Sequence, residues 1–322
     1  MDEATIRKQI PHALEKTDFR LGRKYEGKVR DNYILADRRI IITTDRISAF
    51  DRVLGTIPFK GQVLNQLADF WFDKTKHIVK NHIIDVPDPN VMVVKECVPL
   101  PVEMVVRGYI TGVTTTSAWY NYQRGVRDFC GVRLPEGLRK DQKFEKPIIT
   151  PTTKAGAGEH DRPISGENAI KEGLVSRELF KKMSDVSLKL FDFGSRFVAK
   201  HGLILVDTKY EFGLNEGELV LMDEIHTPDS SRFWFKETYD ELFAKGEEQR
   251  KLDKEYVRTW LAAQGYLGKG KPPKLTSEVV TETAKRYIEA YEKITGSKFE
   301  VREGNVAERI RRNLESKGYL KK

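Results

Sequence analysis

The segment LILVDTKYEFG, residues 203–213, constrains the fold more than any other part of the chain. It begins as an apolar run and then sets Asp207, Lys209 and Glu211 two residues apart. In a β-strand, residues i, i+2 and i+4 point to the same side, so these three charges share one face. If residues 203–212 pair with a returning strand across the turn LNEGE, Asp223 can lie on the same face as Glu211. The alternative is a solvated outer face of an ordinary hairpin, with Lys209 neutralising its neighbours.

Two neighbouring carboxylates suit a divalent cation. Mg²⁺ prefers hard oxygen ligands and is often held by one or two carboxylates together with substrate phosphates, so Glu211 and Asp223 are the predicted metal ligands. The histidines follow no metal-binding spacing, and Cys97 and Cys130 stand far apart with no C-x-x-C pair. These patterns argue against a zinc site and against a disulfide framework.

The order of apolar patterns predicts an α+β protein with two lobes. A short helix over 5–16 is followed by a β-hairpin in YEGKVRDNYILADRRIIITT, an amphipathic helix in GQVLNQLADFWFDKTKHI and further strands. The proline-rich CVPLPVE is a candidate hinge. We therefore expect a smaller lobe at 1–102, with a mainly antiparallel sheet, and a larger α+β lobe at 103–322 that includes the C-terminal helices.

Three short motifs carry cations that suit anionic ligands. In YEGKVRDNY, Lys28 and Arg30 lie on one side of a strand just after a glycine, where they could cover a polyphosphate. Arg107 ends an apolar strand and precedes glycines and hydroxyl residues, and the loop TPDSSRFW adds Ser231 and Arg232. A surface Lys/Arg pair, a strand-end salt bridge and an ordinary turn are the alternative interpretations of the three motifs.

Charge and composition narrow the class of protein. The net charge is +8, which suits an anionic partner, but the basic clusters are short and mixed with glycine and proline. No apolar run approaches the length of a membrane span, and the N-terminus has no secretion signal, so we expect a cytoplasmic protein. There is no P-loop and no G-x-S-x-G elbow. A carboxylate pair with several cation sites favours phosphoryl transfer from a metal-bound nucleotide.

Two other functions fit parts of the sequence. A kinase would share a two-lobed nucleotide site, but H-R-D-L-x-x-x-N and A-P-E are absent. A basic RNA-binding module would explain the high isoelectric point. The aromatic residues, however, are scattered among apolar helix positions, where core packing explains them better than an RNA-binding face does.

Taken together, the motifs resemble one family, the phosphoribosylaminoimidazole-succinocarboxamide synthases, or SAICAR synthetases, of de novo purine biosynthesis. The matching stretches are GKVRDNY, DRISAFD, GQVLNQLADFWF, PVEMVVRGYITG, SAW, GLILVDTKYEFG, LMDEIHTPDSSRFW, DKEYVR and PPKL. They appear in family order between about residue 20 and about residue 295. The resemblance implies the two-lobed SAICAR synthase-like fold, with ATP bound by the smaller lobe and substrates by the larger.

The resemblance also implies the reaction. The carboxylate of carboxyaminoimidazole ribonucleotide is joined to the amine of L-aspartate with ATP and Mg²⁺, through an acyl phosphate, and ADP and phosphate are released. The expected partners are these small molecules, with neither nucleic acid nor membrane. Both a monomer and a small homo-oligomer fit the sequence.

Carried across residue by residue, the motifs imply roles for four groups of side chains. The ATP-binding group, with adenine along CVPLPVEM, is Lys28, Arg30, Glu103, Met104 and Lys154. The substrate-binding group is Ser48, Arg107, Ser117, Asp161, Ser231, Arg232 and Arg258. The catalytic group is Lys209, Asp207 and Asp51, and the metal-binding group is Glu211 and Asp223.

The chain departs from the shorter family pattern in two places. Many members read RGYITGSAW, whereas VTTT here separates Gly112 from Ser117, so any hydroxyl from Thr114 to Ser117 could reach the ribonucleotide phosphate. The chain also continues through KFEVREGNVAERIRRNLESKGYLKK, which has helical character. Two roles are compatible with this segment, residues 298–322: an interface, or a cover over the core.

Overall fold

The computed structural model describes residues 1–49, 52–154, 161–252, 255–266, 268 and 270–321. The chain forms two compact units. Unit 1 comprises Met1–Phe72, His82–Glu96 and Leu252–Lys322, and unit 2 comprises Asp73–Asn81 and Cys97–Lys251. The predicted α+β class is confirmed, with antiparallel sheets in both units. Among the described residues, no helix is both long and apolar enough to cross a bilayer.

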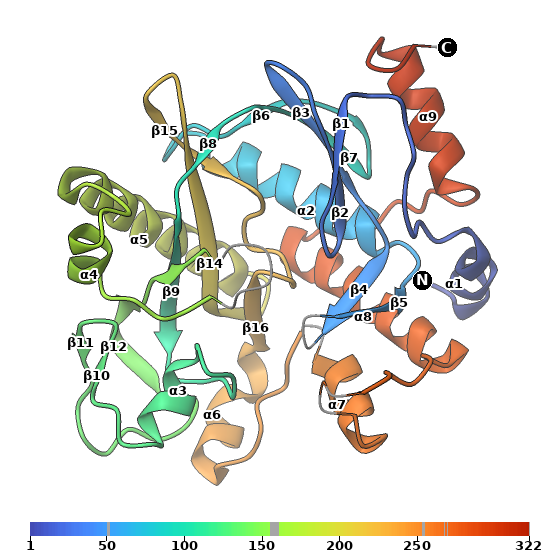
Figure 1. Ribbon diagram of the computed structural model, residues 1–322. Coiled ribbons are helices and arrows are strands. Elements are labelled where there is room, and N and C mark those ends of the chain that lie inside the picture. The colour runs from blue at the N-terminus through green and yellow to red at the C-terminus, as the bar shows by residue number, and fades with distance from the viewer. Residues whose placement is uncertain (50–51, 155–160, 253–254, 267, 269, 322) are drawn as a thin grey trace. The chain divides into compact units, whose positions relative to one another are not determined.

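Unit 1 is built on an antiparallel sheet with the strand order β1-β2-β3-β7-β6 (Figure 1). The predicted hairpin is confirmed, because β2 pairs with β3 with Asn32 opposite Ile41. Alternate residues of β3, Ile40 and Ile42, are fully buried. Separately, β4 pairs antiparallel with β5. The strands of unit 1 are β1 Arg23–Glu26, β2 Arg30–Ile34, β3 Arg38–Thr43, β4 Arg46–Ala49, β5 Arg52–Thr56, β6 Ile83–Asp88 and β7 Val91–Lys95.

The C-terminal segment belongs to unit 1, whereas residues 97–251 belong to unit 2. Val306, Ile310 and Leu314 recur every four residues on helix α9 and are buried in one apolar cluster with Tyr33 and Ile40 of the sheet. This packing places the last helix in unit 1, whereas the prediction assigned residues 103–322 to one lobe. The helices of unit 1 are α1 Glu3–Gln9, the 3₁₀ helix η1 Ile10–His12, α2 Lys60–Thr75, whose last turn lies in unit 2, α7 Glu255–Ala263, α8 Ser277–Thr295 and α9 Val306–Ser316.

The N-terminal helix is shorter than the predicted span of 5–16. The α-helical part ends at Gln9, and a 3₁₀ turn containing Pro11 follows. Pro11 has no N–H to donate the next α-helical hydrogen bond, to the Arg7 carbonyl, which the Ile10 N–H contacts instead, so the α-helix gives way to the 3₁₀ turn.

Unit 2 is organised around strand β14, the long strand drawn beside β9 and β15 in Figure 1. It pairs antiparallel with β9, β15, β16 and β8. The sequence 203–213 thus forms a central strand. The strands of unit 2 are β8 Val98–Pro99, β9 Val102–Tyr109, β10 Asp128–Phe129, β11 Val132–Arg133, β12 Lys143–Ile149, β13 Thr152–Thr153, β14 Leu203–Asn215, β15 Glu218–Met222 and β16 Ser231–Phe235.

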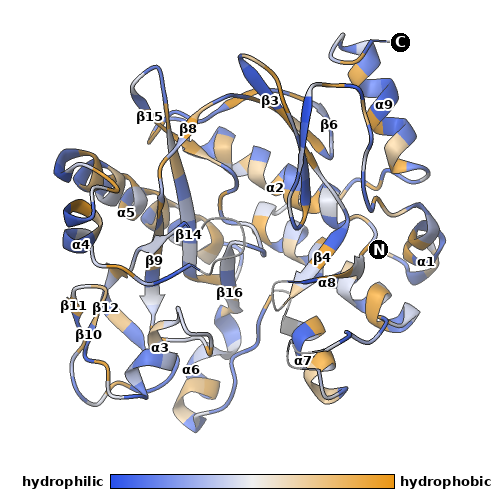
Figure 2. Cartoon of the chain, in the orientation of Figure 1, coloured by the Kyte–Doolittle hydropathy of each residue, from blue (hydrophilic) through white to orange (hydrophobic). Residues whose placement is uncertain are grey.

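One face of this sheet is covered by helix α5. The helix is amphipathic, and hydrophobic and hydrophilic residues alternate along its ribbon in Figure 2. Ser176 caps it by accepting a hydrogen bond from the Leu179 N–H. Gly108 of β9 faces α5 so closely that an added Cβ would lie 3.1 Å from Phe191. The helices of unit 2 are α3 Ala118–Tyr122, α4 Gly166–Lys171, α5 Arg177–Ala199 and α6 Lys236–Lys245.

Candidate active site

The register between β9 and β14 explains the line of acid, base and acid. Asp207 lies opposite Arg107, and Lys209 lies opposite Val105. Since side chains alternate along a strand, Arg107 lies on the face opposite to Gly108, away from α5. The predicted shared face of Asp207, Lys209 and Glu211 is therefore the face that α5 leaves uncovered.

Lys209 connects two carboxylates on this face. Its ammonium donates to Glu103 Oε1 at 2.7 Å and to Glu211 Oε1 at 2.6 Å. The other oxygen of Glu211 accepts from Lys154, which follows β13. Thr152 donates to Glu103 Oε2 at 3.1 Å. We call Glu103, Lys154, Lys209 and Glu211 the carboxylate–lysine cluster. Both acids are buried, so these are not the solvated charges of an ordinary hairpin face.

Burial and the two ammonium groups set the protonation states of the cluster. Burial alone would raise the pKa of Glu211, but Lys209 and Lys154 outweigh it and hold this pKa well below its usual range. Burial raises the pKa of Glu103 to about 7, since Lys209 offsets it only in part and Glu211 adds to it. Burial by itself would lower the pKa of Lys209, but the charges of Glu211 and Glu103 outweigh burial and raise this pKa well above its usual range. Lys209 is thus a cation at neutral pH and not a general base.

A second group on the same face consists of two arginines around one acid. Asp207 Oδ2 accepts from Arg107 Nη1 at 3.2 Å and from Arg232 Nη1. Arg232 is on β16 and lies opposite Asp207 in the register of that pair. Arg107 is buried and also donates to Thr150 Oγ1 at 2.8 Å and to Thr116 O at 2.8 Å. Asp207 thereby fixes two guanidinium groups from neighbouring strands.

Ser117 lies beside this arginine pair. Gly112 adopts φ 92°, and a Cβ added there would lie 2.4 Å from Ser117 Oγ and 3.0 Å from Arg232 Nη2. Only glycine fits this close approach. Ser117 Oγ is 2.7 Å from Thr114 Oγ1, so the VTTT insertion places two hydroxyls together. Of the hydroxyls left open by the sequence, Ser117 thus lies near Arg232, with Thr114 hydrogen-bonded to it.

The predicted metal pair is arranged differently from a simple facing pair. Glu211 lies opposite Met222, the last residue of β15, so Asp223 lies just beyond the strand, with φ 67°. Its charge nevertheless raises the pKa of both Lys209 and Lys154. In the part of the chain that the structure describes, no three His, Cys, Asp or Glu side chains gather into a metal site. Two carboxylates beside two lysines still provide the anionic oxygens that suit Mg²⁺.

Of the remaining predicted residues of unit 2, Asp161 influences the carboxylate–lysine cluster, whereas Met104 and Ser231 lie on the other face of the sheet. Asp161 is exposed, and its charge adds to the raised pKa of Glu103. Met104 is fully buried and lies opposite Tyr210, on the face of the sheet that α5 covers. Ser231 donates to Thr208 Oγ1 at 2.8 Å. By strand alternation this serine lies on the face opposite to its neighbour Arg232, so the structure does not bring the two together.

Four predicted residues are described within unit 1. Lys28 is in the turn between β1 and β2, and Arg30 begins β2. Ser48 is on β4, opposite Val53 of β5. Arg258 is half-buried on α7. The last predicted residue, Asp51, lies outside the described residues.

Sequence reasoning missed several polar residues that complete the site. Thr150 and Thr152, in the motif TPTTK, bind Arg107 and Glu103, and the threonine-rich stretch was the available signal. His226, which was also missed, does not belong to this site: it is fully buried against α5, with Nε2 2.6 Å from Tyr210 Oη, and a Cβ added at Gly194 of α5 would lie 2.4 Å from its ring. Burial lowers the pKa of His226 to about 3, so this imidazole remains neutral.

Known proteins resemble this chain in both sequence and fold. The SAICAR synthetase family model matches residues 23–273. A phosphoribosylaminoimidazole-succinocarboxamide synthase of Legionella pneumophila (strain Paris) is 50% identical over 310 residues, 95% of this chain and 99% of that protein. A solved SAICAR synthase from Saccharomyces cerevisiae, complexed with SAICAR, is 34% identical with a TM-score of 0.79, over 90% of this chain and 100% of that chain. A solved type-2 SAICAR synthetase in complex with ADP is 28% identical with a TM-score of 0.65, over 87% and 100%.

Together with the fold and the charged sheet face, these similarities define an ATP-dependent carbon–nitrogen ligase. The chain belongs to the SAICAR synthetase family, whose reaction joins carboxyaminoimidazole ribonucleotide to L-aspartate in de novo purine biosynthesis.

Proposed function

We propose that the charged face of the unit 2 sheet binds the carboxylated imidazole ribonucleotide and that ligation proceeds through an acyl phosphate. The observation that carries this proposal is the alignment of two groups on one uncovered face, Arg107 and Arg232 around Asp207, and Lys209 between Glu103 and Glu211. One group suits the phosphate of the ribonucleotide, and the other suits its reacting carboxylate.

The phosphate end is assigned to the arginine pair. Guanidinium groups bind phosphate through paired N–H donors, and Asp207 holds both guanidiniums on the face that α5 leaves uncovered. Ser117, next to Arg232, adds a hydroxyl donor. These contacts favour Asp207 as a positioning residue for the arginines, in place of the catalytic role predicted for it.

The carboxylate end is assigned to Lys209. In the acyl-phosphate route, an oxygen of the imidazole carboxylate attacks the γ-phosphorus of ATP and ADP leaves. The amine of L-aspartate then attacks the carbonyl carbon, loses a proton, and the C–O bond breaks to release phosphate. Negative charge increases on the carboxyl oxygens as the amine adds, and a fixed ammonium group stabilises that charge. Lys209 is suited to this role because its raised pKa keeps it protonated.

Mg²⁺ would be held by Glu211 and Asp223. Such an ion, when bound, neutralises charge on the polyphosphate. The low pKa of Glu211 keeps this ligand ionised for a cation. Within unit 1, Lys28 and Arg30 are assigned to ATP phosphates. Roles for Met104 at adenine, for Ser48, Asp51, Asp161, Ser231 and Arg258 at substrates, and a cytoplasmic location, stay predictions.

Two assays test the proposal. Release of ADP is measured with ATP, MgCl₂, the carboxylated imidazole nucleotide and L-aspartate, omitting each component in turn, and turnover is expected only with all four. The nucleotide is then labelled with ¹⁸O in its carboxylate. The acyl-phosphate route transfers one labelled oxygen to inorganic phosphate, because the C–O bond is the one that breaks. Unlabelled phosphate would contradict that route.

A further inference from the structure

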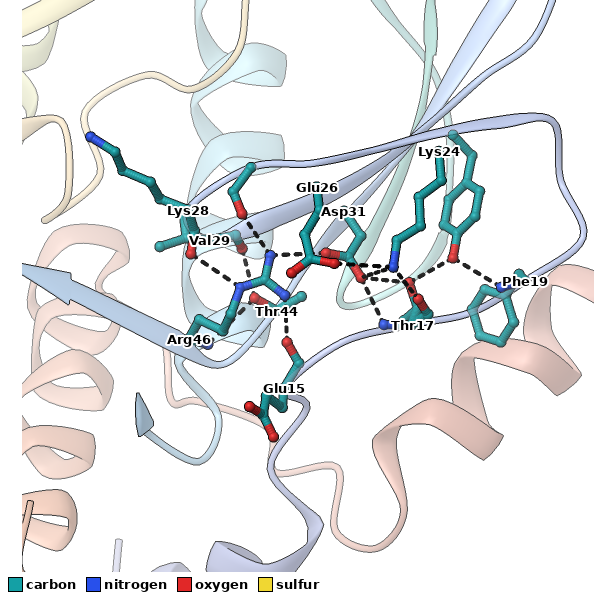
Figure 3. Close-up of polar contacts among 12 residues, drawn as sticks. Glu15, Thr17, Phe19, Lys24, Glu26, Lys28, Val29, Asp31, Thr44 and Arg46 are labelled. Carbon is teal, nitrogen blue, oxygen red and sulfur yellow. Dashed lines mark hydrogen bonds and ion pairs between the residues drawn. The ribbon is translucent and has the colours of Figure 1, made fainter. Parts of the chain in front are cut away.

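The guanidinium of Arg46, the first residue of β4, binds the turn that carries Lys28. Its Nε donates to Lys28 O at 3.1 Å, and its Nη2 donates to Gly27 O at 2.9 Å and to Asp31 Oδ1 at 2.8 Å. Its Nη1 donates to Glu15 O. Figure 3 shows these bonds converging on the Arg46 side chain, which is 4% exposed.

The next carbonyl of the turn, that of Val29, is bound by Thr44, which lies two residues before Arg46. Val29 O accepts from Thr44 N at 3.0 Å and from Thr44 Oγ1 at 2.8 Å, and Gly27 N donates to Arg30 O at 2.8 Å to close the turn. Three successive carbonyls, of residues 27–29, therefore point to the side of Arg46 and Thr44. In a trans peptide the N–H points opposite to the C=O, so the N–H groups of these peptides point to the other side. The Lys28 side chain also extends away from Arg46 (Figure 3).

Asp31 also holds Arg46 in place beside the turn. Its carboxylate is fully buried and accepts from Thr17 N at 2.7 Å and Thr17 Oγ1 at 2.8 Å, besides Arg46. A buried ion pair is by itself weak evidence for a contribution to stability, and the best-attested use of such pairs is to specify one arrangement. Here the arrangement that the pair specifies is the shape of the turn at residues 27–30.

We propose that Arg46 is a positioning residue for nucleotide phosphates, acting through this turn. The inference rests on the proposed assignment of Lys28 and Arg30 to ATP. By binding two of the turn's carbonyls and the Asp31 carboxylate at once, the planar guanidinium fixes the backbone from which both side chains project. Lysine has the same charge but no fork of donors, so it cannot hold all of these acceptors.

The test compares Arg46→Lys with Arg309→Lys. Arg309, on α9 of the same unit, donates to the fully buried Asp88 at 3.0 Å, so its variant also weakens a buried ion pair but contacts no residue of the turn. Because a lysine cannot bind both carbonyls of the turn, Arg46→Lys is expected to raise the KM for ATP and the calorimetric Kd for ADP by about tenfold or more. Its KM values for the ribonucleotide and aspartate should stay within about twofold of wild type. Arg309→Lys should lower the Tm without changing ADP affinity.

A milder variant keeps the test decisive if Arg46→Lys folds poorly. Thr44→Val removes the hydrogen bond from Thr44 Oγ1 to Val29 O, together with the longer one that this oxygen accepts from Arg46 N at 3.4 Å. It is expected to weaken ADP binding about fivefold, the equivalent of one ordinary hydrogen bond. Hydrogen exchange of the peptide spanning residues 24–31 should accelerate in both turn variants and not in Arg309→Lys. Unchanged ADP affinity in Thr44→Val and Arg46→Lys overturns the inference.

Lys28→Ala separates this inference from the assignment on which it rests. If Lys28→Ala weakens ADP binding and the turn variants do not, Arg46 has only a structural role and the proposal is wrong. If Lys28→Ala leaves ADP binding unchanged, the phosphate assignment of Lys28 is wrong, and the inference about Arg46 is overturned with it.

Discussion

Asp207 on β14 lies directly opposite Arg107 on β9, and the Arg107 guanidinium is 3.2 Å from the Asp207 carboxylate. This one register decides what the rest of the face can do. Counting in twos along both strands from this pair places Lys209 beside Val105 and brings Glu103 and Glu211 to the same ammonium group. A shift of β14 by one residue would turn Asp207, Lys209 and Glu211 to the face covered by α5 and separate them from Arg107 and Glu103.

The cation at Lys209 is predicted to be essential for turnover. In Lys209→Met, Glu103 and Glu211 lose their shared partner, and the developing charge on the substrate carboxyl loses its fixed cation. We expect kcat to fall about 100-fold or more, as for loss of a preorganised electrostatic donor. Lys80→Met is the matched control, because it breaks an exposed pair with Glu218 at 2.6 Å and should leave kcat nearly unchanged. Equal kcat in the two variants would contradict the assignment of Lys209.

The metal assignment predicts that each carboxylate is needed. Glu211→Ala and Asp223→Ala should abolish Mg²⁺-dependent turnover while circular dichroism shows an intact fold, since Mg²⁺ binding depends on both anionic ligands. Activity is titrated against MgCl₂ in each variant. Glu218→Ala, on the exposed part of β15, is the control. Near-normal activity in both site variants would remove the metal assignment.

The phosphate assignment predicts a selective change in substrate affinity. Loss of a charged hydrogen-bonding group in Arg232→Ala should weaken ribonucleotide binding by about 1.5–3 kcal/mol, or roughly 10- to 150-fold in KM. The KM for ATP should change much less. Arg250→Ala, which breaks an exposed pair with Glu237, provides the comparison. An unchanged ribonucleotide KM in Arg232→Ala would count against the assignment.

A buried acid of unit 1 predicts a pH dependence of stability. Burial raises the pKa of Asp45 from its ordinary value of 3.8 to about 6, although the N–H groups of Leu14 and Gly61 partly oppose this. Between these two values the folded state binds more protons than the unfolded state, so stability falls as pH rises. This contribution is fully present below about pH 4 and is lost as the pH rises through 6, a change of about 3 kcal/mol.

Urea unfolding at pH 4 and pH 7 checks this prediction. In Asp45→Asn the decrease in the free energy of unfolding between these pH values should be smaller than in wild type by about that amount. The exposed Asp192→Asn should behave as wild type does. The same pH dependence in Asp45→Asn and wild type would show that Asp45 does not titrate in this range.

The packing of α9 predicts that the C-terminal segment stabilises unit 1. Leu314 is fully buried in the cluster with Tyr33, so Leu314→Ala should lower the free energy of unfolding by about 2–5 kcal/mol. Below the melting temperature kcat should be retained. Leu188→Ala, at a leucine that is 38% exposed, should change stability by less than about 0.5 kcal/mol. Equal stability of the two variants, measured by thermal unfolding, would contradict the packing described for α9.

The sequence by itself determined the family and the central charged strand. Alternation along a strand is a local property, so Asp207, Lys209 and Glu211 could be assigned to one face without knowledge of their neighbours. The hairpin of β2 and β3 and the amphipathic helices α2 and α5 could be predicted in the same way, because the spacing of their apolar residues is visible within each segment.

Only the tertiary structure decided which charges meet. The pairing of β9 with β14 chose Arg107 for Asp207, the end of β15 at Met222 placed Asp223 beyond the strand, and the packing of α9 placed the last residues in unit 1. The structure also brought Arg46 to its acceptors, at residues 15 and 27–31, which no local pattern connects to residue 46. Register and long-range packing depend on residues distant in sequence, and periodicity within one segment carries no information about them.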